Sequence, residues 1–194
     1  MKRAFNIIFI LFVFCNYGFS QSEGRQAKLA SIAMGLVDPN IIYDPTYFAL
    51  DYPNGDVPAD RGVCTDVVIR AYRKLGIDLQ KEVHEDMKDN FGLYPNNWGL
   101  KRPDKNIDHR RVPNLMTFFS RRNAAMKISN NSADYQPGDI VCWDLGGGVL
   151  HIGIIVDQKS SDGQRHMIVH NIGNGQVVED FLFQYQIIGH YRFV

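Results

Sequence analysis

The chain has 194 residues with 21 basic and 21 acidic side chains, so its formal net charge at pH 7 is zero. Its length fits one domain. Nucleic-acid binding usually requires a basic stripe, and the only adjacent arginines, Arg110-Arg111 and Arg121-Arg122, form short pairs that we interpret as solvated or ion-paired. We therefore predict no nucleic-acid partner.

Residues 1–20 have the pattern of a secretory signal peptide. A basic start precedes an apolar run that ends at Cys15, and Ser20 is a small residue before the predicted cut. A membrane anchor is the alternative, but the run is shorter than the ~20 apolar residues that cross a bilayer. A lipoprotein anchor at Cys15 is disfavoured because Phe14 is bulky. We expect an exported protein, periplasmic or secreted, with no stable membrane span and a mature chain of 19 basic and 21 acidic residues.

The first half of the mature chain has helical spacing in two places. Residues 24–37 are amphipathic, and Asp38-Pro39 is a helix stop signal. Residues 40–63 are rich in Pro, Gly, Asp and Tyr, and we expect them to be irregular. A second helix is predicted from Cys64 to about Leu75, where a glycine follows.

Two further helices flank a long loop. The first is predicted from Gln80 to Asn90, with Asp78 as its N-cap. The second runs from Pro113 to Arg122, with proline in its first turn. Residues 91–113 between them are polar and aromatic, and loops of this length are often functional. We interpret Trp98 in this loop as a core residue, with a groove wall as the alternative.

After residue 139 the pattern changes from helices to strands. The predicted strands are separated by turns, the first of which is Gly146-Gly147-Gly148. They cover Ile140–Leu145, Val149–Asp157, His166–Asn171, Gln176–Glu179 and Ile187–Phe193. Helices followed by an antiparallel meander indicate an α+β domain.

Cys64 and Cys142 remain after the predicted cleavage. Cys64 lies at the start of a helix, where unpaired N–H groups and the helix dipole favour the reactive thiolate. Cys142 lies in a predicted buried strand, where cysteine often serves as a small hydrophobic residue. An exported protein can join two such residues in a disulfide, but we predict two free thiols, with Cys64 the more reactive.

His151 and His170 lie in predicted strands. A lone histidine on an apolar strand is usually structural, but a cysteine hydrolase needs a nucleophile, a base and a group that orients the base. We therefore predict that Cys64 attacks, His151 takes its proton and His170 orients His151. Asn171, on the other face of the same strand, is the reserve candidate for the orienting role.

Four segments resemble the NlpC-like cysteine peptidases, which have a papain-like fold. They are the helix that Cys64 begins, Tyr135-Gln136-Pro137-Gly138-Asp139-Ile140-Val141, His151-Ile152-Gly153-Ile154-Ile155, and Tyr52-Pro53-Asn54-Gly55, whose tyrosine precedes Cys64 by twelve residues. The resemblance covers residues 47–194. It implies N-terminal helices packed on an antiparallel β-meander or half-barrel, and it leaves residues 21–46 as a helical arm before the hydrolase domain.

The chain is more closely similar to an exported bacterial family catalogued as domain of unknown function 1287. The segments that carry this similarity are Gly62-Val63-Cys64-Thr65-Asp66, Ile107-Asp108-His109-Arg110-Arg111-Val112-Pro113, Val169-His170-Asn171 and Gly189-His190-Tyr191-Arg192. The peptidases usually show Asp-Cys-Ser-Gly at the nucleophile, whereas this chain has Val63-Cys64-Thr65-Asp66. That departure leaves the mechanism intact and leaves the substrate open.

Three residues are candidates for contact with the substrate. Tyr52 is predicted to donate a hydrogen bond to the developing oxyanion, beside the Cys64 N–H. Asp66 is a candidate to replace part of the peptidases' substrate recognition. His109 either lines the cleft or caps the helix that begins near residue 113.

The resemblance implies an exported cysteine peptidase or amidase that cleaves an amide bond, most plausibly in a peptidoglycan peptide. Alternatives are an inactive binding module of the same fold and an acyltransferase or thioesterase, because a fold does not fix chemistry. A metal hydrolase with Cys64, His109, His151 and His170 as ligands lacks the usual ligand spacings. We predict no metal and no cofactor. The sequence sets neither the bond cleaved nor the oligomeric state.

Overall fold

The computed structural model describes residues 23–194, so the predicted signal peptide lies outside the described residues. Four α-helices are described: one over residues 23–34, α2 (Cys64–Lys74), α3 (Leu79–Asn90) and α4 (Val112–Arg121). They precede five antiparallel strands, β3 (Ile140–Asp144), β4 (Leu150–Lys159), β5 (His166–His170), β6 (Val177–Glu179) and β7 (Gln186–Tyr191). The predicted α+β class is confirmed.

Local sequence signals set the helix ends. Asp78 caps α3 by accepting the backbone N–H of Lys81 at 3.2 Å, as its position predicts. Pro113 lies in the first turn of α4, where its missing N–H is harmless. Residues 91–113 form the predicted loop up to the start of α4 at Val112, and they contain two short 3₁₀ helices, η1 (Phe91–Leu93) and η2 (Asp108–Arg110).

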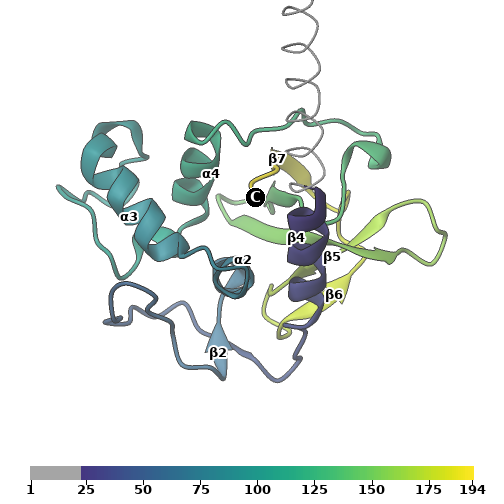
Figure 1. Ribbon diagram of the computed structural model, residues 1–194, viewed down its shortest axis with the longest axis horizontal. Helices are drawn as coiled ribbons and strands as arrows, with labels where there is room; N and C mark the ends of the chain where they lie inside the picture. The colour runs from purple at the N-terminus through teal and green to yellow at the C-terminus, as the bar shows by residue number, and fades with distance from the viewer. Residues whose placement is uncertain (1–22) are drawn as a thin grey trace, which may run out of the picture.

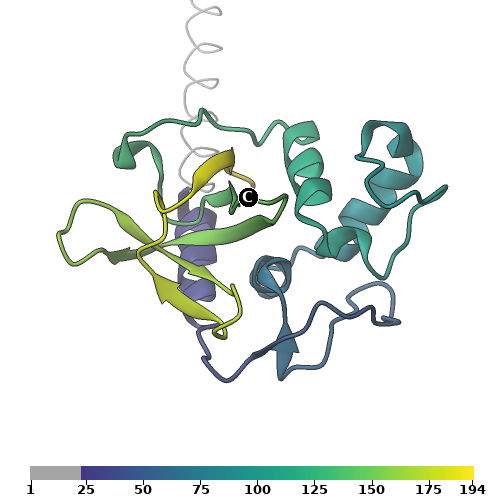
Figure 2. The same cartoon turned by 180° about the vertical axis from the view of Figure 1, so that it is seen from behind.

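The sheet has the order β6-β5-β4-β3-β7. Strands β3 to β6 form the predicted meander, and β4 pairs with β3 so that His151 lies opposite Trp143. The last strand differs from a simple continuation, because β7 returns across the sheet and pairs with the outer edge of β3. In both Figure 1 and Figure 2, α2 stands between the α3–α4 pair and the sheet.

The main hydrophobic core lies between the helices and one face of the sheet. On α2, Val67, Val68 and Ala71 are fully buried in the same cluster as Ile152 and Ile154 of β4. A smaller cluster around Trp143 and Phe181 covers the opposite face of the sheet. This packing fixes the start of α2 against the start of β4.

The helix over residues 23–34 is part of this core and not a separate arm. Its Leu29 and Ala33 are fully buried in the main cluster. Gln26 donates a hydrogen bond to the buried carboxylate of Asp139. A Cβ at Gly138 would approach the Gln26 carbonyl oxygen to 2.3 Å, and Gly138 has φ +91°. The Pro-Gly-Asp segment therefore needs glycine because the helix lies directly on its backbone.

The segment predicted to be irregular contains a short parallel pairing. Two-residue strands β1 (Ile42–Tyr43) and β2 (Arg61–Gly62) align Tyr43 with Gly62. This pairing brings Tyr43 to the segment that leads into Cys64. Within residues 23–194, no helix combines the length and apolar content needed to cross a bilayer.

Candidate active site

Cys64 is the first residue of α2 and follows the N-cap Val63. The carboxylate of Asp66 accepts the Val63 N–H at 2.7 Å and so holds the start of the helix. Cys64 is only 5% exposed. Even so, it lines a cleft of about 420 Å³ together with Tyr43, Pro45, Val63, Asn97, Trp98, Ile107, Arg110, Arg111, Val112, Pro113, Gly148 and Leu150.

The environment of Cys64 favours the neutral thiol. Burial raises the pKa of Cys64 to about 12, although backbone N–H groups, that of Ile152 foremost, oppose the shift. This corrects the expectation that the helix start favours a thiolate, because the cost of burying the charge exceeds the stabilisation from the helix dipole. Cys64 and Cys142 are both free thiols. Cys142 is fully buried in β3, and burial also raises its pKa.

Two histidines and a glutamate form a hydrogen-bonded chain across β4, β5 and β6. Nε2 of His151 lies 2.8 Å from Nδ1 of His170, and Nε2 of His170 lies 3.1 Å from Oε2 of Glu179. His151 and His170 are buried, whereas the side chain of Glu179 is 41% exposed. The structure thus joins His170 to Nε2 of His151 and adds Glu179 to the chain.

The glutamate determines which ring nitrogens carry protons. A carboxylate only accepts hydrogen bonds, so Nε2 of His170 is the donor to Glu179. In the neutral ring Nδ1 of His170 is then the acceptor, and Nε2–H of His151 must donate to it. This leaves Nδ1 of His151 with its lone pair, which is the form that a general base requires.

Burial keeps both rings neutral. Burial lowers the pKa of His151 to about 3, and the neighbouring His170 adds to the decrease. Burial also lowers the pKa of His170, while Glu179 opposes that shift. The resting arrangement is therefore a neutral thiol and a neutral base.

The packing of α2 on β4 sets the position of the Cys64 sulfur relative to β4, the strand that carries His151. The sulfur of Cys64 lies by the backbone N–H of Ile152, the residue that follows His151. No hydrogen bond joins Cys64 to His151 among the described residues. Cys64 is thus a neighbour of the β4 backbone next to His151, whereas the ring of His151 packs on Trp143 and Phe181 and does not line the Cys64 cleft. Catalytic hydrogen bonds are often long before substrate binds.

Tyr43 lines the cleft with Cys64, and sequence reasoning missed it. Partial burial, together with the nearby Cys64 and Asp66, raises the pKa of Tyr43 to about 12, although the residue is 41% exposed. The phenol therefore stays protonated and can donate a hydrogen bond. Its only sequence signal would have been the pairing of two-residue strands, which is too short to recognise in a pattern.

The structure places Tyr52 elsewhere. Its ring packs edge-on against His84 with centroids 5.3 Å apart, and the Lys105 ammonium lies 5.6 Å from its centroid. Tyr52 does not line the Cys64 cleft. The tyrosine twelve residues before Cys64 therefore packs on α3, whereas Tyr43 is the tyrosine that lines the cleft with Cys64.

Asp66 has no free oxygen to offer a substrate. Its carboxylate receives Nε and Nη2 of Arg110 at 2.9 and 3.0 Å, and both side chains are 2% exposed. The hydroxyl of Thr65 donates to the Arg110 carbonyl oxygen at 3.1 Å. These contacts tie η2 to the first turn of α2, so Asp66 positions the cleft.

His109 and Asn171 are buried behind the cleft. His109 is 2% exposed, its Nδ1 has no hydrogen-bond partner, and burial lowers its pKa to about 3. It neither lines the cleft nor caps α4, whose N-cap is Arg111. Asn171 donates to the Gly62 carbonyl oxygen at 3.3 Å, so it anchors the segment before Cys64. Of the two candidates for the orienting role, His170 is the one that is hydrogen-bonded to His151.

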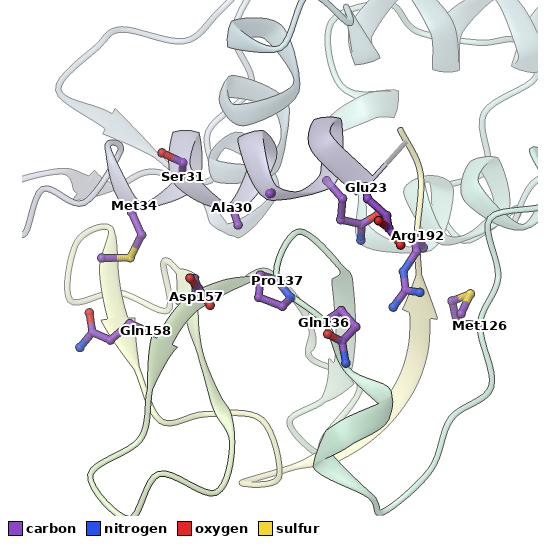
Figure 3. Close-up of a pocket in the computed structure, with 12 residues that line it drawn as sticks. Glu23, Ala30, Ser31, Met34, Met126, Gln136, Pro137, Asp157, Gln158 and Arg192 are labelled. Atoms are coloured by element: carbon purple, nitrogen blue, oxygen red, sulfur yellow. The ribbon is translucent and has the colours of Figure 1, made fainter. Parts of the chain in front are cut away.

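A second cavity, of about 850 Å³, lies between the helix over residues 23–34 and the segments that contain Pro137 and Asp157 (Figure 3). Ala30 and Met34 face Pro137 and Asp157 across it. It shares no lining residue with the Cys64 cleft and contains no cysteine or histidine. Within residues 23–194, no group of three or more His, Cys, Asp and Glu side chains is arranged to hold a metal ion. The Cys64 cleft is thus the candidate active site.

The residues of this cleft lie in a part of the chain whose sequence is similar to that of known proteins. A family model described as "Domain of unknown function (DUF1287)" matches residues 30–193, a range that includes Cys64, His151, His170 and Glu179. The chain is also 53% identical over 165 residues to the uncharacterized protein YijF of Escherichia coli (strain K12). That alignment covers 85% of this chain and 80% of the relative.

Proposed function

The chain belongs to the DUF1287 family, and from the site described above we propose that it is an exported cysteine hydrolase with a papain-like fold of the NlpC type. In this proposal Cys64 attacks the carbonyl carbon of an amide. The observation that carries the proposal is the chain from His151 through His170 to Glu179, because it leaves Nδ1 of His151 unprotonated at the start of β4.

The reaction proceeds through an acyl-enzyme. As Sγ of Cys64 bonds to the carbonyl carbon, its proton passes to Nδ1 of His151. The C–N bond then breaks, and His151 returns the proton to the leaving amine. Water attacks the thioester with His151 again as base, which releases a carboxylic acid and restores the thiol. Because thiol and base are both neutral at rest, proton transfer accompanies attack instead of preceding it.

Neighbouring groups stabilise the charges that develop during attack. The imidazolium that forms at His151 is stabilised through His170 by the carboxylate of Glu179. The oxyanion would receive the N–H of Cys64, at the first position of α2, and the hydroxyl of Tyr43. Beside a cysteine that is only 5% exposed, such donors stabilise charge more strongly than they would in bulk solvent.

We place the protein outside the cytoplasm, in the periplasm or secreted, on the basis of residues 1–20. A hydrolase exported in this way meets the cell wall, so we propose a peptide amide of peptidoglycan as the substrate. The same thioester could be transferred to another acceptor, and an acyltransferase or thioesterase therefore uses the same residues.

A second candidate is a binding module that keeps the fold without turnover. The raised pKa of Cys64 and the missing hydrogen bond to His151 favour it. The two candidates differ in whether Cys64 becomes acylated, because a binding module needs no nucleophile.

The test is digestion of purified peptidoglycan, with released fragments identified by mass. We expect the wild-type protein to release fragments with a new amine and a new carboxylate. Cys64→Ala and His151→Ala should release none, whereas Cys142→Ala, which removes the other thiol, should match the wild type. Activity in Cys64→Ala would refute the cysteine mechanism. A wild type that neither releases fragments nor forms an adduct with an acyl-transferring electrophile would refute the hydrolase and leave the binding module as the remaining candidate.

A further inference from the structure

The charged side chains that line the cleft beside Cys64 are all positive. Among the side chains that line it, Arg110 and Arg111 are cationic and none is acidic. The two arginines differ in what they already bind. Arg110 is 2% exposed at its side chain, pairs with both oxygens of Asp66 and also donates to backbone carbonyls. Four of its five N–H groups are used and its charge is already paired with Asp66, so an anion in the cleft would meet Arg111.

Arg111 is held from two sides and remains open on a third. Its Nη1 donates to the buried carboxylate of Asp108 at 3.2 Å. Its guanidinium carbon lies 3.9 Å from the ring centroid of Trp98, so the two planar groups are in contact. Within residues 23–194, Nε and Nη2 of Arg111 have no hydrogen-bond partner. Stacking on an aromatic ring restricts the guanidinium without using its donors.

Trp98 belongs to the same wall of the cleft. The side chain is 41% exposed, which corrects its assignment to the core. A large aromatic ring kept near solvent loses hydrophobic stabilisation, and here it supports the arginine next to the proposed nucleophile. Trp98 and Arg111 both line the cleft to which Cys64 contributes.

We propose that Arg111, supported by Trp98, binds a carboxylate of the substrate beside the amide that Cys64 attacks. This inference rests on the proposed function and narrows its substrate class to amides that carry a nearby free carboxylate. Two N–H groups of one guanidinium match the two oxygens of a carboxylate. The carboxylate of Asp108 already pairs with the Arg111 guanidinium and reduces the positive charge that a ligand meets. A singly charged carboxylate therefore suits the subsite better than a multiply charged phosphate.

The test uses the Cys64 thiol as a reporter and does not require turnover. In a Cys142→Ala background, Cys64 is alkylated with iodoacetamide at pH 9 in the presence of N-acetyl-glutamic acid methylamide. The matched probe is N-acetyl-glutamine methylamide, which differs only in having a carboxamide for the carboxylate. Inorganic phosphate is the third probe. We expect the glutamic acid probe alone to slow alkylation.

Two variants locate the effect. Arg111→Gln should raise the probe concentration that halves the alkylation rate by about tenfold, which is the usual loss for one charge-assisted pair. Trp98→Ala should weaken protection and Trp98→Phe should retain most of it, because a phenyl ring can still support the guanidinium. The control is Arg122→Gln, since Arg122 also lies over an aromatic ring, at 5.1 Å from that of Phe118, but is remote from the cleft.

Equal protection by the glutamine probe, equal protection by phosphate, or unchanged protection in Arg111→Gln would overturn the inference. None of these results bears on the cysteine mechanism, which is decided by wall digestion with Cys64→Ala. Conversely, protection that depends on Arg111 in a protein without hydrolytic activity would leave a carboxylate-binding cleft and refute only the proposed hydrolysis.

Discussion

Two local effects shift the pKa of the Cys64 thiol in opposite directions. The start of α2 offers N–H groups and a partial positive charge, which stabilise a thiolate by roughly 1 kcal/mol at an exposed site. Removal of the sulfur from water acts against the charged form, and burial determines the result. The thiol must therefore lose its proton to a base as it attacks. In the proposed mechanism the neutral His151 accepts that proton.

The first prediction concerns the alkylation of Cys64 as a function of pH. Because its pKa is raised to about 12, the thiolate fraction at pH 7 is on the order of 10⁻⁵. In the Cys142→Ala protein, the rate with iodoacetamide should rise about tenfold per pH unit from pH 7 to 10. The measurement is adduct mass against time. A rate that reaches a plateau between pH 5 and 8 would instead indicate a thiolate–imidazolium pair.

The second prediction separates the orienting role of His170 from simple packing. His170→Asn keeps an acceptor for Nε2–H of His151, whereas His170→Ala removes it and leaves a cavity. We expect kcat/KM for wall-peptide hydrolysis to fall about 100-fold in His170→Ala and by about tenfold or less in His170→Asn. Circular dichroism at matched concentration checks that both variants fold. Equal activity of the two variants would assign the orienting role to another group.

Among the elements, η2 and the first turn of α2 depend on one buried ion pair. Asp66 accepts both Arg110 and the Val63 N–H, so a single carboxylate fixes the wall of the cleft and the N-terminus of its helix. A buried pair contributes little compared with apolar packing, but removal of one partner leaves the other charged and unpaired.

The third prediction is the stability of Asp66→Ala. We expect a loss of about 3–5 kcal/mol in the free energy of unfolding, because Arg110 would remain buried without a counter-charge. Asp60→Ala is the matched control, since Asp60 pairs with Arg61 at the surface and its side chain is 62% exposed. That variant should unfold at nearly the wild-type urea concentration. Similar midpoints for the two variants would show that the Asp66–Arg110 pair is not structurally required.

The sequence predicts these elements well where their signals are local. The start of α2 at Cys64, the cap at Asp78 and the glycine hairpin between β3 and β4 each depend on neighbouring residues, and each is confirmed. The return of β7 to the edge of β3 depends on contacts between distant segments, which no local pattern specifies.

The parts of the site that sequence reasoning missed are also non-local. Tyr43 reaches the cleft only through the two-residue pairing of β1 with β2. Glu179 is a partly exposed acid on a three-residue strand, and nothing in its own segment distinguishes it from a surface residue. The pKa of Cys64 depends on how closely α2 packs on β4, which the helix pattern does not contain.

At the scale of the whole molecule, Asp139 joins the two ends of the described chain. Its carboxylate accepts Gln26 from the first helix and His190 and Arg192 from the last strand and the residues that follow it. Burial alone would raise the pKa of Asp139, but Arg192, His190 and the Gln136 N–H lower it below its usual value. The group therefore stays ionised at neutral pH. Its stabilising effect is present above about pH 4 and declines as the pH falls through its lowered pKa.

As the pH falls, the buried neutral histidines begin to reduce the stability of the fold at a higher pH than Asp139 does. Burial lowers the pKa values of His109 and His151 to about 3 and lowers that of His170. Below about pH 6.5 the unfolded chain takes up protons at these rings and the folded chain does not. Each such histidine therefore reduces the free energy of unfolding by up to about 1.4 kcal/mol per pH unit as the pH falls. Asp108 acts in the opposite direction, because burial raises its pKa to about 6 and the folded state binds that proton more tightly.

The fourth prediction isolates one of these protons with His109→Gln. His109 does not line the cleft and its Nδ1 has no partner, so glutamine removes the titration without disturbing the His151–His170–Glu179 chain. Urea denaturation from pH 7 to 4 should show wild-type stability declining with falling pH, with a decline in the variant that is shallower by about 1.4 kcal/mol per pH unit below pH 6. Equal slopes would mean that His109 binds its proton as readily in the folded chain as in the unfolded one. A shallower slope with unchanged Cys64 alkylation would show that protonation of His109 contributes to acid unfolding without altering the reactivity of the proposed nucleophile.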